Sequence, residues 1–544
     1  MDSTMMDVPL TIGAIMRHGT TVHRDAEVVT WTGNPAGPRR ASFGDVGRRA
    51  AQLAGALRGL GVTGDQRVAT FQWNNQEHLE AYLAIPSMGA VLHTLNLRLG
   101  PDQVAWIANH AEDHVVIVDG SLVPLLAKAL PECKTIEHVV VTGEADTAPL
   151  AGAGKQVHSY DELLAAQPET FDWPEDIDER SAAAMCYTSG TTGNPKGVTY
   201  SHRSAYLHSM ALLAGEAAGL TAADRCLPVV PMFHANAWGI PYGAVMAGAG
   251  MLMPDRFLQA PPLVEMVERE RPTVSGAVPS IWNDVLRHLR EHGGDFSSMR
   301  VVLCGGSAVP RALMQSFDEE IGVRILQAWG MTETSPLASV AAPPAGAEGE
   351  DAWRYRTTAG RVLIGVQARV VADDDSVLPS DGDAVGEIEV RGPWITGSYN
   401  SGADPDRFHD GWLRTGDVGT IDELGYITIS DRSKDVIKSG GEWISSVELE
   451  NALMGHPAVV EAAVIGVPDP RWEERPLATV VVAEGESVSP AQLREYLGDT
   501  VPKWQLPERW SFIPEVPKTS VGKFDKKLIR QRYADGELDV HEQR

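Results

Sequence analysis

Residues 187–197 read YTSGTTGNPKG and follow the apolar approach AAAMC of residues 182–186. Glycines let backbone N–H groups approach phosphate oxygens, hydroxyl side chains add donors, and the lysine supplies a positive charge. The stretch therefore has the composition of an anion-binding loop, although a flexible surface loop is the alternative. It does not match the P-loop of kinases and GTPases, because Pro195 stands where that pattern requires its second glycine.

On both sides of this loop the pattern indicates an α/β fold. Residues 115–118, 139–142 and 301–303 are short aliphatic runs bounded by Gly or Asp, as buried strands are. Apolar residues recur every three or four positions over 46–60 and stop at Gly61, which predicts an amphipathic helix. Alternating elements of these two kinds predict α/β layers.

The chain of 544 residues is too long for one ordinary core. A charged stretch near Asp431 leads into glycines, a helix-like run and a strand-like run. We therefore expect a large multi-lobed N-terminal domain over 1–430, a hinge over 431–437 and a small α+β C-terminal domain over 438–544.

Two polar stretches are expected to lack regular structure. Residues 343–351 are rich in proline, glycine and acids, which predicts an exposed loop. Residues 534–544 form a polar tail that we do not expect to order itself.

Composition limits the class of partner. A formal net charge of −27 disfavours a nucleic-acid or anionic-membrane surface. The N-terminus lacks a basic region, and no apolar run approaches the roughly 18 residues of a membrane span. We expect a cytoplasmic protein in a reducing compartment, because the cysteines have no paired spacing; they are Cys133, Cys186, Cys226 and Cys304.

Residues 188–197 resemble the phosphate loop of the acyl-adenylate-forming family, which includes acyl-CoA synthetases, firefly luciferase and peptide-synthetase adenylation domains. Further motifs follow in the family's order across nearly the whole chain, and the resemblance is greatest to the fatty-acyl-CoA synthetase branch. It implies an acid–thiol ligase that uses ATP, Mg²⁺ and coenzyme A, with a mobile C-terminal domain and a homodimeric assembly.

The resemblance also implies a nucleotide site. Trp329 stands where the family usually has an adenine-stacking tyrosine, so stacking is kept and a phenolic hydrogen bond is lost. Asp417 would accept hydrogen bonds from the ribose hydroxyls, and Glu333 with Thr188 would hold Mg²⁺. The implied ATP and AMP contacts are Thr188, Ser189, Gly190, Thr191, Thr192, Gly193, Lys196, Gly305, Gly306, Ser307, Gln327, Ala328, Trp329, Gly330, Thr332, Asp417, Arg432 and Lys438.

The C-terminal motifs imply the moving parts. Lys523 resembles the family's lysine that closes on the acyl phosphate during adenylation, a task that suits a long mobile cation. Asp431 would be the pivot of the hinge, and coenzyme A would approach past Gly440, Gly441 and Trp443. The implied catalytic residues are Lys523, Glu333, His234 and Arg432.

Residues 231–238, PMFHANAW, resemble the segment that lines the acyl pocket of fatty-acyl-CoA synthetases. His234 would orient the acid and Trp238 would gate an acyl tunnel, although both could simply be core residues. His234 stands where amino-acid-activating domains usually carry an Asp, which disfavours an amino-acid substrate. Residues 278–282 are further candidates for the tunnel wall. Medium or long fatty acids are favoured, and a short acid such as 3-methylthiopropionate stays open.

Two rival functions remain. A luciferase-like oxygenase would share the adenylation chemistry, but no residue in the sequence specifically indicates oxygenase activity. A catalytically silent nucleotide-binding protein would keep the fold alone, and intact Glu333, Asp417, Arg432 and Lys523 argue against it.

Overall fold

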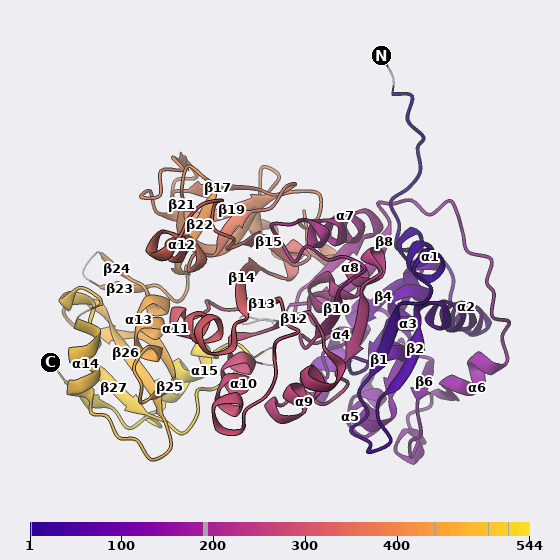
Figure 1. Ribbon diagram of the computed structural model, residues 1–544, viewed down its shortest axis with the longest axis horizontal. Helices are drawn as coiled ribbons and strands as arrows, with labels where there is room; N and C mark the ends of the chain where they lie inside the picture. The colour runs from indigo at the N-terminus through magenta and orange to yellow at the C-terminus, as the bar shows by residue number, and fades with distance from the viewer. Residues whose placement is uncertain (2, 189–193, 440–441, 499, 520–521, 544) are drawn as a thin grey trace.

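The computed structural model describes residues 1, 3–188, 194–439, 442–498, 500–519 and 522–543. A large N-terminal body carries two sheets and a third lobe, and a small C-terminal body lies beside it (Figure 1). The N-terminus and the C-terminus lie at opposite sides of the molecule. The predicted fold class, a multi-lobed α/β domain followed by a smaller α+β domain, is confirmed.

The first sheet carries the start of the phosphate loop at the end of β8. Its described strands run in the order β7-β6-β5-β3-β4-β8-β9, and all neighbours are parallel except the last pair. The strands are β3 Arg67–Phe71, β4 Val91–Thr94, β5 Asp113–Asp119, β6 His138–Thr142, β7 Gln156–Ser159, β8 Ala182–Tyr187 and β9 Gly197–Ser201.

The second sheet is long and changes character along its length. From β1 to β14 the neighbouring strands β11, β10, β12 and β13 are parallel, whereas beyond β14 the pairing is antiparallel and forms the upper lobe of Figure 1. Its described strands are β1 Glu27–Thr30, β2 Arg39–Ser42, β10 Arg225–Pro228, β11 Gly250–Met253, β12 Val274–Ala277, β13 Val301–Gly305, β14 Arg324–Gly330, β15 Leu337–Val340, β16 Gly360–Val362, β17 Gln367–Val371, β18 Val377–Leu378, β19 Gly386–Arg391, β20 Phe408–His409, β21 Trp412–Ile421 and β22 Tyr426–Arg432.

Helices cover both faces of the parallel strands. In β5, Val115 and Ile117 join the central core between the sheets, while Val116 and Val118 join an outer core. This alternation follows from the two-residue period of a strand buried on both faces. The helices of the large body are α1 Ile12–Val22, α2 Phe43–Gly59, α3 Gln76–Ser87, α4 Pro101–Ala111, α5 Val123–Ala129, α6 Tyr160–Ala165, α7 His202–Leu213, α8 Ile240–Ala247, α9 Ala260–Glu270, α10 Pro279–His292, α11 Arg311–Ser316 and α12 Gly349–Arg356.

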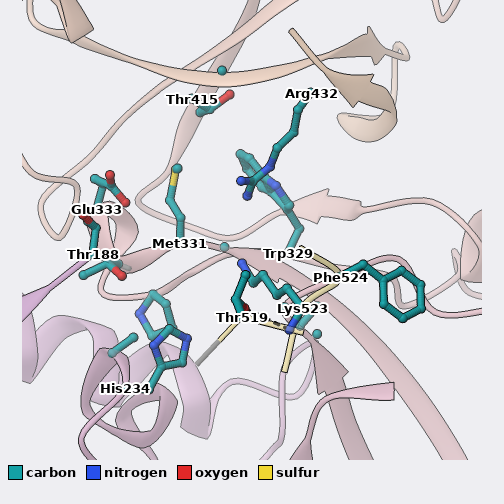
Figure 2. A pocket seen from close by; sticks show the side chains of 18 of the residues that line it. Thr188, His234, Trp329, Met331, Glu333, Thr415, Arg432, Thr519, Lys523 and Phe524 are labelled. Atoms are coloured by element: carbon teal, nitrogen blue, oxygen red, sulfur yellow. Dashed lines mark hydrogen bonds between the residues drawn. The ribbon is translucent and has the colours of Figure 1, made fainter. Parts of the chain in front are cut away.

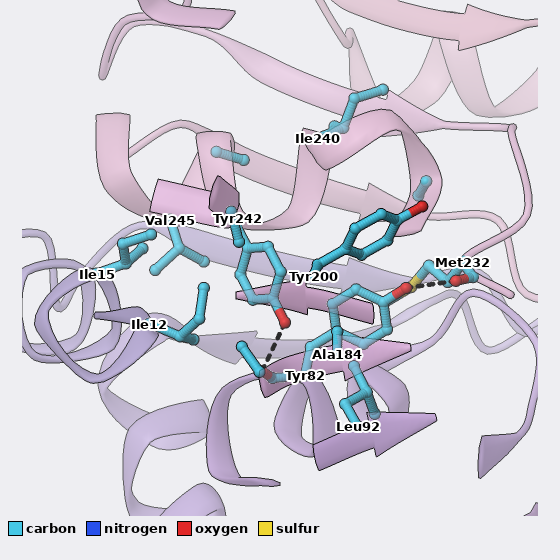
Figure 3. Packing of buried hydrophobic residues seen from close by; sticks show 14 of the residues in the cluster. Ile12, Ile15, Tyr82, Leu92, Ala184, Tyr200, Met232, Ile240, Tyr242 and Val245 are labelled. Atoms are coloured by element: carbon cyan, nitrogen blue, oxygen red, sulfur yellow. Dashed lines mark hydrogen bonds between the residues drawn. The ribbon is translucent and has the colours of Figure 1, made fainter. Parts of the chain in front are cut away.

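Buried tyrosines tie the central core to the acyl-pocket segment (Figure 3). The hydroxyl of Tyr242 in α8 donates to the backbone oxygen of Tyr82 in α3 at 3.2 Å. The Tyr82 hydroxyl in turn donates to the backbone oxygen of Met232. Because each buried hydroxyl has a partner, the core holds the start of the segment 231–238 without an unsatisfied polar group.

The small body is built on a separate sheet whose described order is β24-β23-β26-β27-β28, with β25 paired to β26. Its strands are β23 Ile437–Ser439, β24 Glu442–Ile444, β25 Val459–Asp469, β26 Glu473–Val482, β27 Arg509–Phe512 and β28 His541–Glu542. Its helices are α13 Ser446–Met454, α14 Pro490–Gly498 and α15 Lys526–Ala534. It has its own apolar core around Trp510, so these hydrophobic residues are buried against one another within the small body.

The predicted helix over 46–60 and the three predicted strands are present as α2, β5, β6 and β13. Two expectations were wrong. The loop over 343–351 ends early, because α12 begins at Gly349. The tail over 534–544 is not structureless: β28 pairs with β27, and Leu538 and Val540 pack on an apolar cluster of the small body.

No helix in the described part of the chain has the length and apolar character needed to cross a membrane.

Candidate active site

A cavity of about 530 Å³ lies where the two bodies meet, at the ends of β8, β13 and β14. An adjoining cavity of about 280 Å³ shares part of its wall. The residues predicted from sequence that line the larger cavity are Thr188, Lys196, His234, Trp238, Gly305, Gly306, Ala328, Trp329, Gly330, Thr332, Glu333, Arg432 and Lys523. Ser307, Gln327, Asp417 and Asp431 line the adjoining one. Motifs that are far apart in sequence thus meet in one place.

Two predicted residues lie elsewhere. Lys438 and Trp443 are register partners in the β23–β24 hairpin and line neither cavity. The Trp443 side chain is exposed, and the Lys438 backbone N–H donates to Glu474 Oε2 at 3.0 Å. Gly440 and Gly441, like Ser189, Gly190, Thr191, Thr192 and Gly193 of the phosphate loop, lie outside the described residues.

The two ends of the phosphate loop are joined by hydrogen bonds. The Thr188 N–H donates to the Lys196 backbone oxygen at 2.9 Å, and the Lys196 N–H donates to Thr188 Oγ1 at 3.1 Å. The Lys196 ammonium forms an ion pair with Asp404 and lies 5.1 Å from the centroid of the Tyr399 ring. A phosphate bound at this loop would therefore compete with Asp404 for the lysine.

Trp329, Asp417 and Arg432 form a connected group above the cavity. The Trp329 indole Nε1 donates to Asp417 Oδ2 at 2.8 Å, and Arg432 Nε lies 3.4 Å from Asp417 Oδ1. Asp417 is 5% exposed, so two donors hold its carboxylate in a fixed orientation. Gly330 is required beside Trp329, because an added Cβ would lie 1.8 Å from the Pro336 backbone oxygen.

Glu333 and Thr188 present oxygen atoms on one wall of the cavity, as Figure 2 shows. The Tyr399 hydroxyl donates to Glu333 Oε1 at 2.5 Å. The Thr396 N–H donates to the Glu333 backbone oxygen at 2.8 Å, which fixes the turn that carries the carboxylate. A hydroxyl and a carboxylate are hard oxygen donors of the type that Mg²⁺ prefers, so these residues fit that ion.

Lys523 enters the cavity from the small body. Hydrogen bonds join Thr519 to Lys523: the Thr519 N–H donates to the Lys523 oxygen at 2.7 Å, and the Lys523 N–H donates to Thr519 Oγ1 at 3.2 Å. The Lys523 side chain passes beside Gly306, where an added Cβ would lie 3.7 Å from Lys523 Cε. Burial, aided by the charge of Arg432, lowers the pKa of Lys523 to about 8.

His234 and Trp238 line the same cavity on the side of the large body. Burial lowers the pKa of His234 to about 3, with the charge of Lys523 as a further cause. His234 is therefore neutral near pH 7 and can donate or accept a hydrogen bond at a carboxylate. Apolar Leu212, Leu303 and Leu337 also line the cavity.

A left-handed turn carries Trp238. Ala235, Asn236, Ala237 and Trp238 have φ values of 41°, 49°, 49° and 58°. Each such residue costs about 1–2 kcal/mol, so surrounding contacts must hold the turn. One of them is the buried Cys186 thiol, which donates to Asn236 Oδ1 at 2.9 Å.

Small residues surround the Trp238 indole. An added Cβ would lie 3.6 Å from this ring at Gly276 and 3.8 Å from it at Gly305. The proposed wall over 278–282 is only partly present: Pro279 and Ser280 line the adjoining cavity, but Trp282 is buried in a separate core against Phe317.

The sequence reasoning missed two lining residues, Tyr399 and Arg407, and Asp404, which pairs with a lining residue. Tyr399 holds Glu333, Asp404 pairs with Lys196, and Arg407 donates to the Thr415 backbone oxygen at 3.0 Å. They lie in an irregular segment between β19 and β21 that contains no recognisable motif. Only their position in the fold reveals their part in the site.

The comparison with known families decides the identity of this site. The profile described as AMP-binding enzyme matches residues 16–400, and that of the AMP-binding enzyme C-terminal domain matches residues 448–523. The chain belongs to the AMP-binding enzyme family. The resemblance found from the phosphate loop is thereby confirmed.

Two relatives that match this AMP-binding enzyme over nearly its whole length are CoA ligases. It is 42% identical to the 3-methylmercaptopropionyl-CoA ligase of Ruegeria pomeroyi over 98% of each chain. It is 43% identical to the long-chain-fatty-acid–CoA ligase of Thermus thermophilus over 98% of this chain and 97% of the relative. The crystal structure of the anthranilate CoA ligase AuaEII with anthranoyl-AMP has a TM-score of 0.87 at 25% identity, covering 99% of this AMP-binding enzyme and 100% of that chain.

Proposed function

We propose that this protein is an AMP-forming acyl-CoA ligase that activates a hydrophobic carboxylic acid. The observation that carries the proposal is the position of Lys523, from the small body, in a cavity that also holds His234 and the Trp329, Arg432 and Glu333 side chains. The Lys523 ammonium thus lies between the apolar leucines of the cavity and the group of Trp329 and Arg432, which suits a nucleotide.

In the first step the acid's carboxylate attacks the α-phosphate of ATP, and pyrophosphate leaves. Trp329 would stack on adenine, Asp417 would accept from the ribose hydroxyls, and Lys523 would neutralise charge that develops on the α-phosphate. His234 would orient the acid. The described positions support these roles. His234 lines the larger cavity, Asp417 lines the adjoining one, and Trp329, Arg432 and Lys523 line both.

In the second step the thiol of coenzyme A attacks the acyl-adenylate, and AMP leaves. Lys438 and Trp443 lie away from the cavity, whereas Lys523 lies in it. We therefore assign the present arrangement to adenylation. We propose that the small body, 438–544, then swings about a hinge at 431–437, so that the face carrying Lys438 and Trp443 replaces the face carrying Lys523 at the cavity. Such a movement would exclude water from a hydrolysable intermediate.

Glu333 and Thr188 would hold Mg²⁺, which supplies positive charge to the phosphate oxygens when bound. Tyr399 would orient the Glu333 carboxylate for this task, since its hydroxyl already donates to Glu333 Oε1. The homodimeric state and the cytoplasmic location stay predictions of the sequence.

The acid is proposed to be a medium- or long-chain fatty acid. The described lining contains no acidic residue on the apolar side near Trp238, which agrees with an uncharged tail. A second candidate is a short acid such as 3-methylmercaptopropionate, because the Ruegeria ligase that acts on it matches this chain over 98% of its length.

The test is coenzyme A-dependent formation of AMP and pyrophosphate with acids from propionate and 3-methylmercaptopropionate to palmitate. Preference within the panel identifies the acid. Pyrophosphate release that needs an acid but not coenzyme A for its first turnover, with AMP released only when coenzyme A is added, supports the two-step order. Absence of AMP with every acid would contradict the ligase proposal and favour a silent nucleotide-binding protein.

A further inference from the structure

Three histidines and a glutamate gather at the edge of the first sheet, away from the cavity. One ligand atom each from His114, Glu137 and His138 lies within 4.8 Å of the others, the only such group of three among the described residues. His138 Nδ1 also lies 3.1 Å from His158 Nε2. We propose that this cluster is a binding site for a divalent transition-metal ion of the Zn²⁺ class, with His114, Glu137 and His138 as ligands.

The parallel strands place these residues. The Glu137 N–H donates to the His114 backbone oxygen at 2.9 Å, and the Gln156 N–H donates to the Glu137 oxygen at 3.0 Å. The ring centroids of His114 and His138 are 5.7 Å apart, and those of His138 and His158 are 5.3 Å apart. The backbone ladder of β5, β6 and β7 therefore fixes the backbone positions of the ligand residues before any ion arrives, which lowers the ordering cost of binding.

The distances suit coordination after a small closure. His114 Nδ1 lies 3.9 Å from Glu137 Oε1, whereas two ligands on a tetrahedral Zn²⁺ with bonds of about 2.0–2.1 Å are about 3.3 Å apart. The Glu137 side chain is 66% exposed and free to make that movement. Two imidazoles and a carboxylate form a ligand set suited to Zn²⁺, Co²⁺ or Ni²⁺ rather than Mg²⁺ or Ca²⁺.

His158 has a different part. A nitrogen–nitrogen contact of 3.1 Å requires one ring to donate and the other to accept, so His158 fixes the orientation of the His138 ring. Partners of this kind orient metal-binding imidazoles in known sites. His158 is thus a positioning residue, and the three other side chains are the ligands.

The site is remote from the chemistry. His114 is the second residue of β5 and His138 the first residue of β6, whereas Thr188 follows the last residue of β8. Since these strands are parallel, the cluster lies at their N-terminal ends and the phosphate loop begins at the C-terminal end of β8. An ion here would join β5 to β6 and stabilise the sheet without touching the nucleotide.

The test is titration of the full chain, freed of metals with a chelator, with Co²⁺ and Zn²⁺ alone. We expect a stoichiometry of one ion per chain, a visible Co²⁺ absorption band and a rise in Tm. Glu137→Gln and His114→Ala should each weaken binding by about tenfold or more, and His158→Ala by a similar factor. Glu137 is exposed, so its variant should fold normally.

The matched control is His292→Ala on α10. His288 and His292 stack at 4.5 Å and are a second place where a histidine pair could take a metal. Binding that survives this change and is lost in Glu137→Gln supports the proposal. Absence of binding, or binding lost in His292→Ala and kept in Glu137→Gln, would overturn it.

Discussion

The indole Nε1 of Trp329 donates a 2.8 Å hydrogen bond to Asp417 Oδ2, across 88 residues of sequence. Asp417 also faces Arg432, so the proposed ribose acceptor is oriented by the proposed adenine platform and by a residue of the proposed hinge. This relationship gives the tryptophan a polar function that stacking alone would not require.

Trp329→Phe keeps an aromatic face and removes the donor to Asp417. We expect kcat/KM for ATP to fall by about 10- to 100-fold, because a hydrogen bond to a charged group is worth about 1.5–3 kcal/mol. Steady-state kinetics of adenylation measure it. Trp472→Phe, an exposed position of the small body, is the control; an equal effect in both variants would contradict the assigned contact.

Lys523→Ala removes the cation that the small body places in the cavity. Adenylation should fall by about 10²–10³-fold, as when one donor to a developing charge is lost. Conversion of supplied acyl-AMP to acyl-CoA should change little, since the second step is proposed to use the face of the small body that carries Lys438 and Trp443. Rapid-quench assays of the two half-reactions separate these outcomes. Lys503→Ala, on the surface, should leave both unchanged.

The pKa of Lys523, lowered to about 8 by burial, predicts the pH dependence. The ammonium is charged below this pKa and is lost as the pH rises through it. The kcat/KM for adenylation should therefore fall above pH 8, by about tenfold at pH 9, because this parameter reports the free enzyme. In Lys523→Arg, whose guanidinium does not titrate there, the remaining activity should stay level over this range. If kcat/KM still fell above pH 8 in Lys523→Arg, the pH dependence would belong to another group.

Trp238→Ala should open space next to Gly276 and Gly305. We expect the preference within the acid panel to move toward longer chains, since a ring that lines the cavity is removed. Competition assays with pairs of acids measure the shift. Trp472→Ala is the control, and an unchanged preference in Trp238→Ala would mean that the tail passes elsewhere.

Ser446→Ala tests how the hinge holds the adenylation arrangement. Asp431 Oδ2 accepts from the Ser446 N–H at 2.6 Å and from its hydroxyl at 2.5 Å, and Lys526 Nζ donates to the same hydroxyl at 2.6 Å. Loss of this hydroxyl should slow adenylation by up to about tenfold and leave the second half-reaction unchanged. Ser489→Ala is the control in the same body. Equal loss in both half-reactions would indicate a general effect on stability.

The local parts of the fold were predictable because their signals are local. The β5 and β13 strands are short aliphatic runs, and α2 has the apolar spacing of a helix. The strand β28 was missed, since its two residues carry no strand pattern and pair with Arg509 and Trp510 of β27, which are distant in sequence.

The sequence by itself determined the family and the order of the site motifs, because backbone glycines, hydroxyls and charges must be adjacent in the chain to form each loop. Only the tertiary structure decided which residues complete the site. Tyr399 reaches Glu333 across 66 residues and Trp329 reaches Asp417 across 88, and such contacts depend on packing between elements. The position of Lys523 depends on packing of the same kind, because it is set by how the small body lies against the large one.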